Sequence, residues 1–199
     1  EEGFRAATAL YLTMFPATTG DWGQWGAYFP DYLRQQRKLD NFSYIADCAD
    51  FDWLCHLAAR AENNECQIAS LSLLNVLDSY QIYLQPNPAL SIIKSSYPLY
   101  AIWQAHHGSH TQRDKYMQQA KAQLGKLENA YVLIHRPNWQ VQLIPITYSD
   151  FLFWQCLLSG QSLGAALDSV ANTDFSIENW LTLAIQNNWI NKFYGGETL

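Results

Sequence analysis

The segment Asn129–Ile146, "NAYVLIHRPNWQVQLIPI", limits the possible folds of this chain most, because it predicts two β-strands inside an otherwise helical sequence. β-Branched and aromatic residues concentrate in residues 130–136 and 139–146, and Pro137 and Asn138 between them predict a tight turn. A two-stranded hairpin is only marginally stable alone in water. The sequence therefore predicts an α+β protein, mainly α, in which the hairpin packs against helices.

The residues before the hairpin predict helices joined by loops. In chain order we expect a helix over residues 4–14 ended by Pro16, a glycine-rich loop over 17–26, a short helix from Pro30, a long amphipathic helix over 40–63, an extended segment from 87, a helix from Pro98 to about His106, and a surface loop or marginal helix over 111–129. Residues 67–86 fit a helix in "SLSLLNVL" and a strand in "SYQIYL", and both interpretations stay open.

Three helices and a possible last strand, "NKFYGG", are expected after the hairpin. Thr147 or Ser149 can cap the first helix, Ser162 the second and Ser176 the third. Two strands followed by three helices are typical of a small winged-helix-like module. We therefore place a domain boundary near Gly125, between a helical domain (residues 1–125) and a winged-helix-like domain (residues 126–199).

A winged helix suggests DNA binding, but the charges of this domain argue against it. After residue 128 the only basic residues are Arg136 and Lys192, against five acids, and the third predicted helix, residues 176–190, has no Lys or Arg. Phosphate neutralisation and guanine recognition both depend on such cations. The whole chain carries a net charge of −6, so nucleic acid and anionic membranes are disfavoured as partners.

The edge of the hairpin is a second candidate for function, because an edge strand exposes N–H and C=O groups to which an extended peptide can add. In the first strand Tyr131, Leu133 and His135 face one side, and Val132, Ile134 and Arg136 face the other. From the residues alone, a strand that only completes the module is favoured over a docking edge.

Candidate metal ligands are present but their spacing favours structural roles. His106 and His110 are four residues apart, yet Gly108 is expected to end the helix between them. The stripe Cys48–Asp52–Cys55–His56 is more typical of a helix face with small buried thiols than of a metal site. Asp47 and Asp52 are expected to have hydrogen-bonding or cationic partners, or to contact another protein. We assign no catalytic residue, no metal and no cofactor to this chain.

The composition indicates one or two domains and, as an expectation, a cytoplasmic location. No run of 18 apolar residues predicts a membrane span, and the first residues, "EEGFRAATALYL", do not have the pattern of a signal peptide. The four cysteines form no CxxC pair and are too sparse for a disulfide scaffold.

Four segments together resemble the HvfC/BufC-type family, long labelled as DNA-binding domains: "GAYFPDYL", "YIADCADFDWLCHLA", "IIKSSYPLYAIWQAH" and "VLIHRPNWQVQLIPI". The resemblance covers about residues 4–192. It is carried by Phe29, Pro30 and Leu33, by Ala46, Asp47, Ala49, Trp53 and His56, by Ser95, Tyr97, Pro98, Leu99, Ile102 and Trp103, and by Arg136, Pro137 and Val141. Asp52 stands where the family has Glu before Trp.

This resemblance implies a non-catalytic subunit that forms a heterodimer with a TIM-barrel multinuclear non-haem iron oxidase. Such oxidases modify cysteines of a ribosomally made precursor peptide, as in methanobactin, where an oxazolone and a thioamide make a copper chelator. The iron would lie in the partner subunit, and the winged-helix-like domain would be a recognition element for the precursor's leader peptide. The alternative function is a winged-helix transcription regulator.

The resemblance also turns two sets of residues into candidate sites. The expected leader-peptide site is the strand Tyr131, Val132, Leu133, Ile134, His135 and Arg136. The expected oxidase interface contains Trp22, Trp25, Tyr28, Asp52, Tyr97, Tyr100 and His106, although core packing is the more common role of such aromatic residues. A contribution of Asp52, His56 or His106 to a shared active site is disfavoured.

Overall fold

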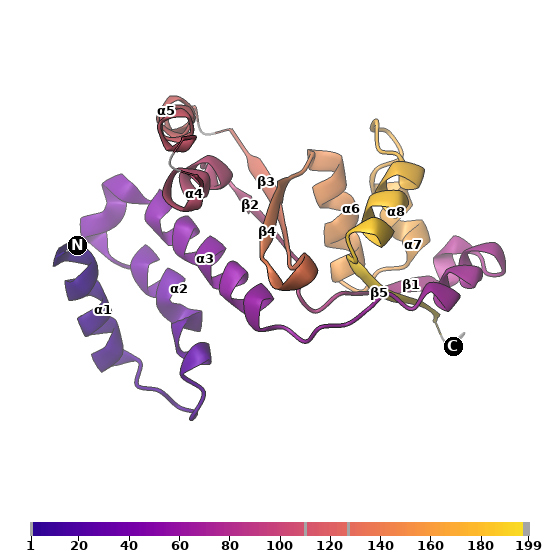
Figure 1. Ribbon diagram of the computed structural model, residues 1–199, viewed down its shortest axis with the longest axis horizontal. Coiled ribbons are helices and arrows are strands. Elements are labelled where there is room, and N and C mark those ends of the chain that lie inside the picture. Colours follow the sequence, from indigo (N-terminus) through magenta and orange to yellow (C-terminus); the bar gives the residue numbers. More distant parts are fainter. Residues whose placement is uncertain (1, 110, 127, 197–199) are drawn as a thin grey trace. The chain divides into compact units, whose positions relative to one another are not determined.

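The computed structural model describes residues 2–109, 111–126 and 128–196, and Figure 1 shows its course. It is an α+β protein, mainly helical, with small antiparallel sheets. The chain forms two compact units: unit 1 comprises Glu1–Leu54 and Tyr97–Glu128, and unit 2 comprises Cys55–Ser96 and Asn129–Leu199. Among the described residues, no helix is both long enough and apolar enough to cross a membrane.

The two units do not follow a single boundary near Gly125. The chain passes from one unit to the other three times, and only the last passage, after Glu128, lies close to the predicted position. Residues 55–96, which we assigned to the N-terminal domain, pack within unit 2. The physical reason is strand pairing over long sequence distances, which local hydrophobic patterns do not report.

Unit 1 is helical. Its elements are α1 (Glu2–Met14), a 3-10 helix (Trp22–Tyr28), α2 (Phe29–Arg34), a second 3-10 helix (Arg37–Phe42), the first part of α3 (Tyr44–Arg60), α4 (Leu99–His107) and α5 (Arg113–Leu124). The predicted helices are confirmed, and the residues left between a loop and a marginal helix form α5. The glycine-rich segment is not simply a loop, because Asp21 caps the first 3-10 helix by accepting a hydrogen bond from the Gly23 N–H at 2.9 Å.

Aromatic side chains fill the centre of unit 1. Tyr11, Tyr32 and Leu33 are buried, and the Tyr11 hydroxyl donates a 2.6 Å hydrogen bond to the Trp25 carbonyl. The ring of Tyr11 also stacks on Phe15 with centroids 5.0 Å apart. The apolar spacing that predicts α1 therefore places one tyrosine of this helix in the core.

Unit 2 contains all the strands of the described residues. Its elements are the end of α3, a 3-10 helix (Ile68–Asn75), a short 3-10 turn (Ser79–Gln81), β1 (Ile82–Pro86), β2 (Ser91–Ser95), β3 (Ala130–His135), a turn over Pro137–Trp139, β4 (Gln142–Pro145), α6 (Tyr148–Leu158), α7 (Leu163–Ser169), α8 (Ile177–Gln186) and β5 (Ile190–Gly195). Both readings of residues 67–86 thus hold in part: a 3-10 helix comes first and a strand follows.

The predicted hairpin exists, but it is not alone. β3 pairs with β4 and also with β2, so that the sheet order is β2-β3-β4 and β3 is the central strand. The possible last strand is confirmed as β5, which pairs with β1 in a separate two-stranded sheet. This arrangement answers the stability problem of an isolated hairpin, because a third strand completes the sheet.

The helices after β4 build the core of unit 2. Phe153, Trp154 and Leu157 of α6, together with Trp180 and Ala184 of α8, are buried in one cluster. The cap predictions are confirmed for all three helices. Thr147 and Asp150 form a capping box, and the hydroxyls of Ser162 and Ser176 accept hydrogen bonds from Ala165 N–H and Asn179 N–H.

Candidate functional site

The strand predicted to bind a leader peptide cannot offer an edge. β3 has β2 on one side and β4 on the other, so both rows of its backbone groups are directed at neighbouring strands. Its residues Leu133 and Ile134 are 0% exposed. The expectation that Tyr131 to Arg136 form a docking edge is therefore wrong. The sequence does not show that β3 is the central strand. The extended residues near Ile92 form β2, but nothing in their pattern indicates that they pair with β3.

Arg136 has a structural contact instead of a peptide-binding one. Its guanidinium donates hydrogen bonds to the carbonyls of Ala61, at 2.6 Å, and Ala59, at 3.4 Å. These carbonyls lie at the end of α3, where backbone acceptors lack helical partners and a cation is favourable. The guanidinium also lies over the Trp139 ring, 4.8 Å from its centroid. Arg136 therefore ties the hairpin turn to the end of α3.

His135 is a buried, neutral side chain. It is 2% exposed, and both ring nitrogens lack a hydrogen-bond partner among the described residues. Burial lowers the pKa of His135 from its ordinary 6.5 to about 4, and the nearby backbone of Asn187 opposes this shift without completing a hydrogen bond. The ring meets Trp189 edge to face at 5.8 Å. Such a side chain packs the interior and is not available to a peptide.

The outer edge of β4 offers the backbone groups that β3 lacks. The Ile146 N–H donates to the Tyr131 carbonyl at 3.0 Å, and the register pairs Ile144 with Leu133. Because bonding pairs alternate along antiparallel strands, Leu143 and Pro145 direct their backbone groups away from β3. The outer edge therefore presents the N–H and C=O of Leu143 and the C=O of Pro145.

A pocket of about 300 Å³ lies beside this edge. Residues 144–147 of the β4 edge form one wall, and α6, α8 and the segment before α8 supply the rest. Trp154, Trp180 and Trp189 all line it, and the indole N–H groups of Trp180 and Trp189 are buried without a partner in the described part of the chain. Both nitrogens are inaccessible to solvent, so the pocket meets the rings of these tryptophans and not their N–H groups.

The outer edge and the pocket together have the features of a peptide-binding cleft. An added strand would satisfy the backbone of Leu143, and the apolar walls would accept its side chains. Asp150 and Asp174 also line the pocket, but Asp150 is already engaged with the Thr147 N–H and hydroxyl. We call the outer edge of β4 and this pocket the β4 cleft. Sequence reasoning missed it, although Pro145 is itself a sign of an edge strand.

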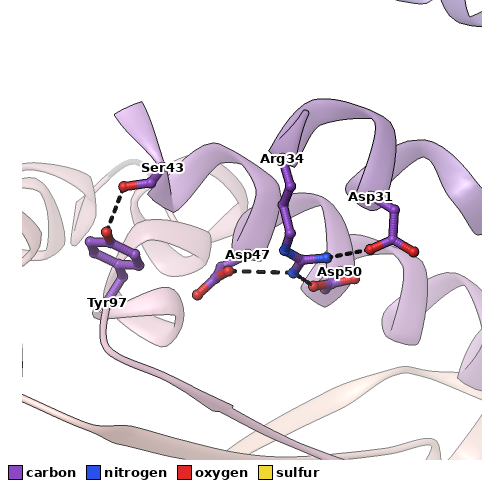
Figure 2. Close-up of polar contacts among 6 residues, drawn as sticks. All are labelled: Asp31, Arg34, Ser43, Asp47, Asp50 and Tyr97. Carbon is purple, nitrogen blue, oxygen red and sulfur yellow. Dashed lines mark hydrogen bonds and ion pairs between the residues drawn. The ribbon is translucent and has the colours of Figure 1, made fainter. Parts of the chain in front are cut away.

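The aromatic residues expected at an oxidase interface differ in exposure. Trp22 is 70% and Tyr28 is 64% exposed, which fits residues that can contact another molecule. Trp25 is partly buried, and its indole N–H donates to the Phe15 carbonyl. Tyr97 and Ser43 share a 2.7 Å hydroxyl–hydroxyl hydrogen bond, shown in Figure 2. Only some of the predicted residues are therefore presented to the surface.

Tyr100 also belongs to the internal packing of unit 1. It is partly buried, its hydroxyl accepts a hydrogen bond from the Gln104 side chain at 3.1 Å, and its ring meets Tyr116 of α5 edge to face at 6.3 Å. These contacts hold α4 and α5 together, so Tyr100 has a structural role whether or not it reaches a partner.

Asp52 and His106, also predicted at the interface, meet at a smaller pocket of about 220 Å³ between α3 and α4. Partial burial raises the pKa of Asp52, and the imidazoles of His107 and His106 oppose the shift. Burial, then Asp52 and Asp47, raises the pKa of the Cys48 thiol in the same pocket to about 12. A thiol held protonated is a poor nucleophile and a poor metal ligand.

An acidic cluster around Arg34, drawn in Figure 2, joins α2 to α3. The guanidinium binds Asp31 at 2.9 Å, Asp47 at 3.5 Å, and Asp50. Burial alone would lower the pKa of Arg34, but the hydrogen bond and charge of Asp50 raise it above its ordinary value. The prediction of a cationic partner for Asp47 is thus confirmed. The i, i+3 spacing of Asp31 and Arg34 already indicates an ion pair on α2, which the sequence analysis did not consider.

The metal hypothesis for the histidine segment falls partly outside the described residues, because His110 is not among them. Within the described part of the chain, no three His, Cys, Asp or Glu side chains are arranged to hold a metal ion. His107 stacks on Trp103 with centroids 4.6 Å apart.

Comparison with models of known protein families and with curated protein sequences gives no match for this chain.

Proposed function

We propose that this chain is a peptide-recognition subunit that binds the leader of a ribosomal precursor peptide in the β4 cleft. The leader would add as a strand to the outer edge of β4, with side chains in the neighbouring pocket. The single observation that carries the proposal is the position of this pocket, because residues 144–147 beside the outer edge of β4 line it together with the aromatic side chains of Trp154, Trp180 and Trp189.

The arrangement of unit 2 supports this proposal. A three-stranded sheet followed by three helices resembles a winged helix used for peptide recognition, and the cleft lies between its edge strand and α8. α8 contains no basic residue, which disfavours DNA as the occupant. Main-chain hydrogen bonds would supply affinity and the pocket would supply specificity.

The proposed partner is a TIM-barrel multinuclear iron oxidase, to which this chain would present exposed aromatic residues of unit 1. Trp22 and Tyr28 are the best placed of the predicted interface residues, because their side chains are largely exposed. The iron would belong to the oxidase, and this chain would carry neither metal nor catalytic residue. The oxidase would convert precursor cysteines by methanobactin-type chemistry.

Tethering explains how such a subunit would help without chemistry of its own. A leader held on this chain turns delivery of the modifiable cysteines into an intramolecular step. A short flexible linker gives effective concentrations on the order of millimolar. The oxidase can then act on a precursor that it binds weakly by itself.

The decisive test compares two proline substitutions on opposite edges of the sheet. Leu143→Pro removes the outward N–H of β4 and leaves its bonds to β3, whereas Lys94→Pro does the same on the outer edge of β2. A fluorescently labelled leader of a candidate precursor peptide is titrated onto each variant. We expect Leu143→Pro to weaken binding about 3- to 10-fold, the effect of one hydrogen bond, and Lys94→Pro to leave it unchanged.

Two other outcomes would contradict the proposal. If only Lys94→Pro weakens leader binding, the peptide binds at the β2 edge and the pocket beside β4 has no role in recognition. Failure of the chain to bind any leader or to co-purify with the oxidase, together with a salt-dependent shift of duplex DNA, would return the regulator hypothesis.

A further inference from the structure

A second, larger cavity lies in unit 1, and its walls are mainly aromatic. It has a volume of about 500 Å³ and is lined by the end of α1, the segment that follows it, the 3-10 helix Trp22–Tyr28 and one ring of α3. Five aromatic side chains line it: Tyr11, Phe15, Trp25, Tyr28 and Trp53. We call this cavity the aromatic pocket. Its size lies within the usual range of small-molecule and side-chain sites.

The charge of the aromatic pocket has one sign. Asp21 is its only acidic lining residue, and no Lys, Arg or His is among the described residues that line it. The carboxylate is held in place because it caps the 3-10 helix through Gly23 N–H.

Aromatic walls add a second attraction for positive charge. A cation is drawn to a ring face when it lies within about 6 Å of the centroid. Because five aromatic side chains line a pocket of only about 500 Å³, a group inside it lies close to several of these rings. A negative or neutral polar guest would gain neither attraction.

We propose that the aromatic pocket binds the guanidinium of an arginine side chain supplied by a protein partner. Guanidinium is planar, weakly hydrated, stacks on aromatic rings and pairs with a carboxylate through two parallel donors. An ammonium is compact and strongly hydrated, so it uses aromatic walls less well. This inference goes beyond the peptide cleft of unit 2, involves different residues, and does not depend on what that cleft binds.

Tight packing around Gly26 keeps the aromatic pocket in shape. A Cβ added at Gly26 would lie 3.1 Å from the ring of Trp53, so the ring sits directly against the backbone of the 3-10 helix. Phe15 and Tyr28 are nearly parallel, with an interplanar angle of 19° and centroids 6.3 Å apart. The rings are therefore positioned by the fold before any guest arrives, which lowers the entropic cost of binding.

The experiment uses the full chain and three small probes. N-acetyl-arginine amide, N-acetyl-lysine amide and N-acetyl-citrulline amide are titrated while the indole N–H resonances of Trp25 and Trp53 are followed by NMR. We expect saturable shifts with the arginine probe at a Kd on the order of 1–10 mM, as suits one isolated side chain. The lysine probe should bind at least about threefold more weakly, and the neutral citrulline probe should not saturate.

Matched variants locate the site. Asp21→Asn keeps an N-capping oxygen, so the 3-10 helix is retained while the charge is lost, and the arginine probe should bind about 3- to 10-fold more weakly. Tyr28→Leu removes an exposed wall and should weaken binding about two- to fivefold. Glu65→Gln removes the same charge from an exposed position of unit 2 that lines neither the aromatic pocket nor the β4 cleft, and it should change nothing. The proposal is overturned if citrulline or lysine binds as tightly as arginine, if Asp21→Asn has no effect, or if no probe binds below about 50 mM.

Discussion

The buried imidazole of His135 predicts a loss of stability in mild acid that a single substitution should remove. His135 is the last residue of the central strand β3, its ring has no hydrogen-bond partner among the described residues, and burial lowers its pKa to about 4. In the unfolded chain the same group titrates near 6.5. Below pH 6.5 the unfolded state therefore binds a proton at His135 that the folded state does not bind, and the free energy of unfolding falls.

The size of the effect follows from the two pKa values. The stability that His135 confers by remaining neutral is fully present above pH 6.5 and is lost as the pH falls toward 4. Each pH unit in that window corresponds to about 1.4 kcal/mol. Between pH 7 and pH 5 the free energy of unfolding should fall by about 2 kcal/mol from this group alone.

The assay compares the wild type with His135→Leu in urea unfolding at pH 7, 6 and 5, followed by tryptophan fluorescence and circular dichroism. Leucine fills a similar volume and leaves no buried ring nitrogens, so stability at pH 7 should be equal or higher. The variant should lack about 2 kcal/mol of the acid loss.

Two results would refute this reasoning. Equal acid loss in the wild type and His135→Leu would mean that His135 titrates normally in the folded protein. A large loss of stability at pH 7 in His135→Leu would mean that the ring makes a hydrogen bond essential for folding.

Three further substitutions test contacts of unit 2, each by the change in unfolding free energy. Arg136→Met should lower the free energy of unfolding by about 2–4 kcal/mol, because charge-assisted hydrogen bonds to the carbonyls of Ala61 and Ala59 are lost. Arg136→Lys should recover only part of this loss. An unchanged stability of Arg136→Met would contradict the anchoring role. Gly164→Ala should cost about 1–3 kcal/mol, since its Cβ would lie 2.8 Å from the Tyr80 ring; a neutral or stabilising result would show that this ring yields freely. Thr147→Ala should cost about 1 kcal/mol by breaking the capping box, whereas Thr147→Ser should restore most of it.

Local features of this fold could be predicted from the sequence, and long-range ones could not. Helical spacing, cap residues and the hairpin turn act over a few neighbours, so α1, the cap at Ser162 and the pairing of β3 with β4 follow from patterns that can be read directly. The partner of β2 lies about forty residues away in the sequence, so β3 was wrongly predicted to be an edge.

The candidate sites show the same division. The edge of the sheet was predicted at β3, whereas the edge strand is β4, because the choice between them depended on where β2 pairs. The sequence did single out Trp25 and Tyr28, but it could not show that Trp53 lines a cavity with them. Pockets arise from elements that are distant in sequence, and their chemistry is visible only when the elements are together.

The pairing of β1 with β5 means that β1 is synthesised well before the strand with which it pairs. Tyr83 lies opposite Tyr194, which is 111 positions further along the chain. At translation rates of 5–20 residues per second, β1 waits roughly 6 to 22 seconds on the ribosome before its partner has been made. During that interval Ile82 and Leu84, which end in the core of unit 2, have no finished strand to cover them. Unit 2 is therefore expected to need a chaperone, or slow release, more than the helical part of the chain does.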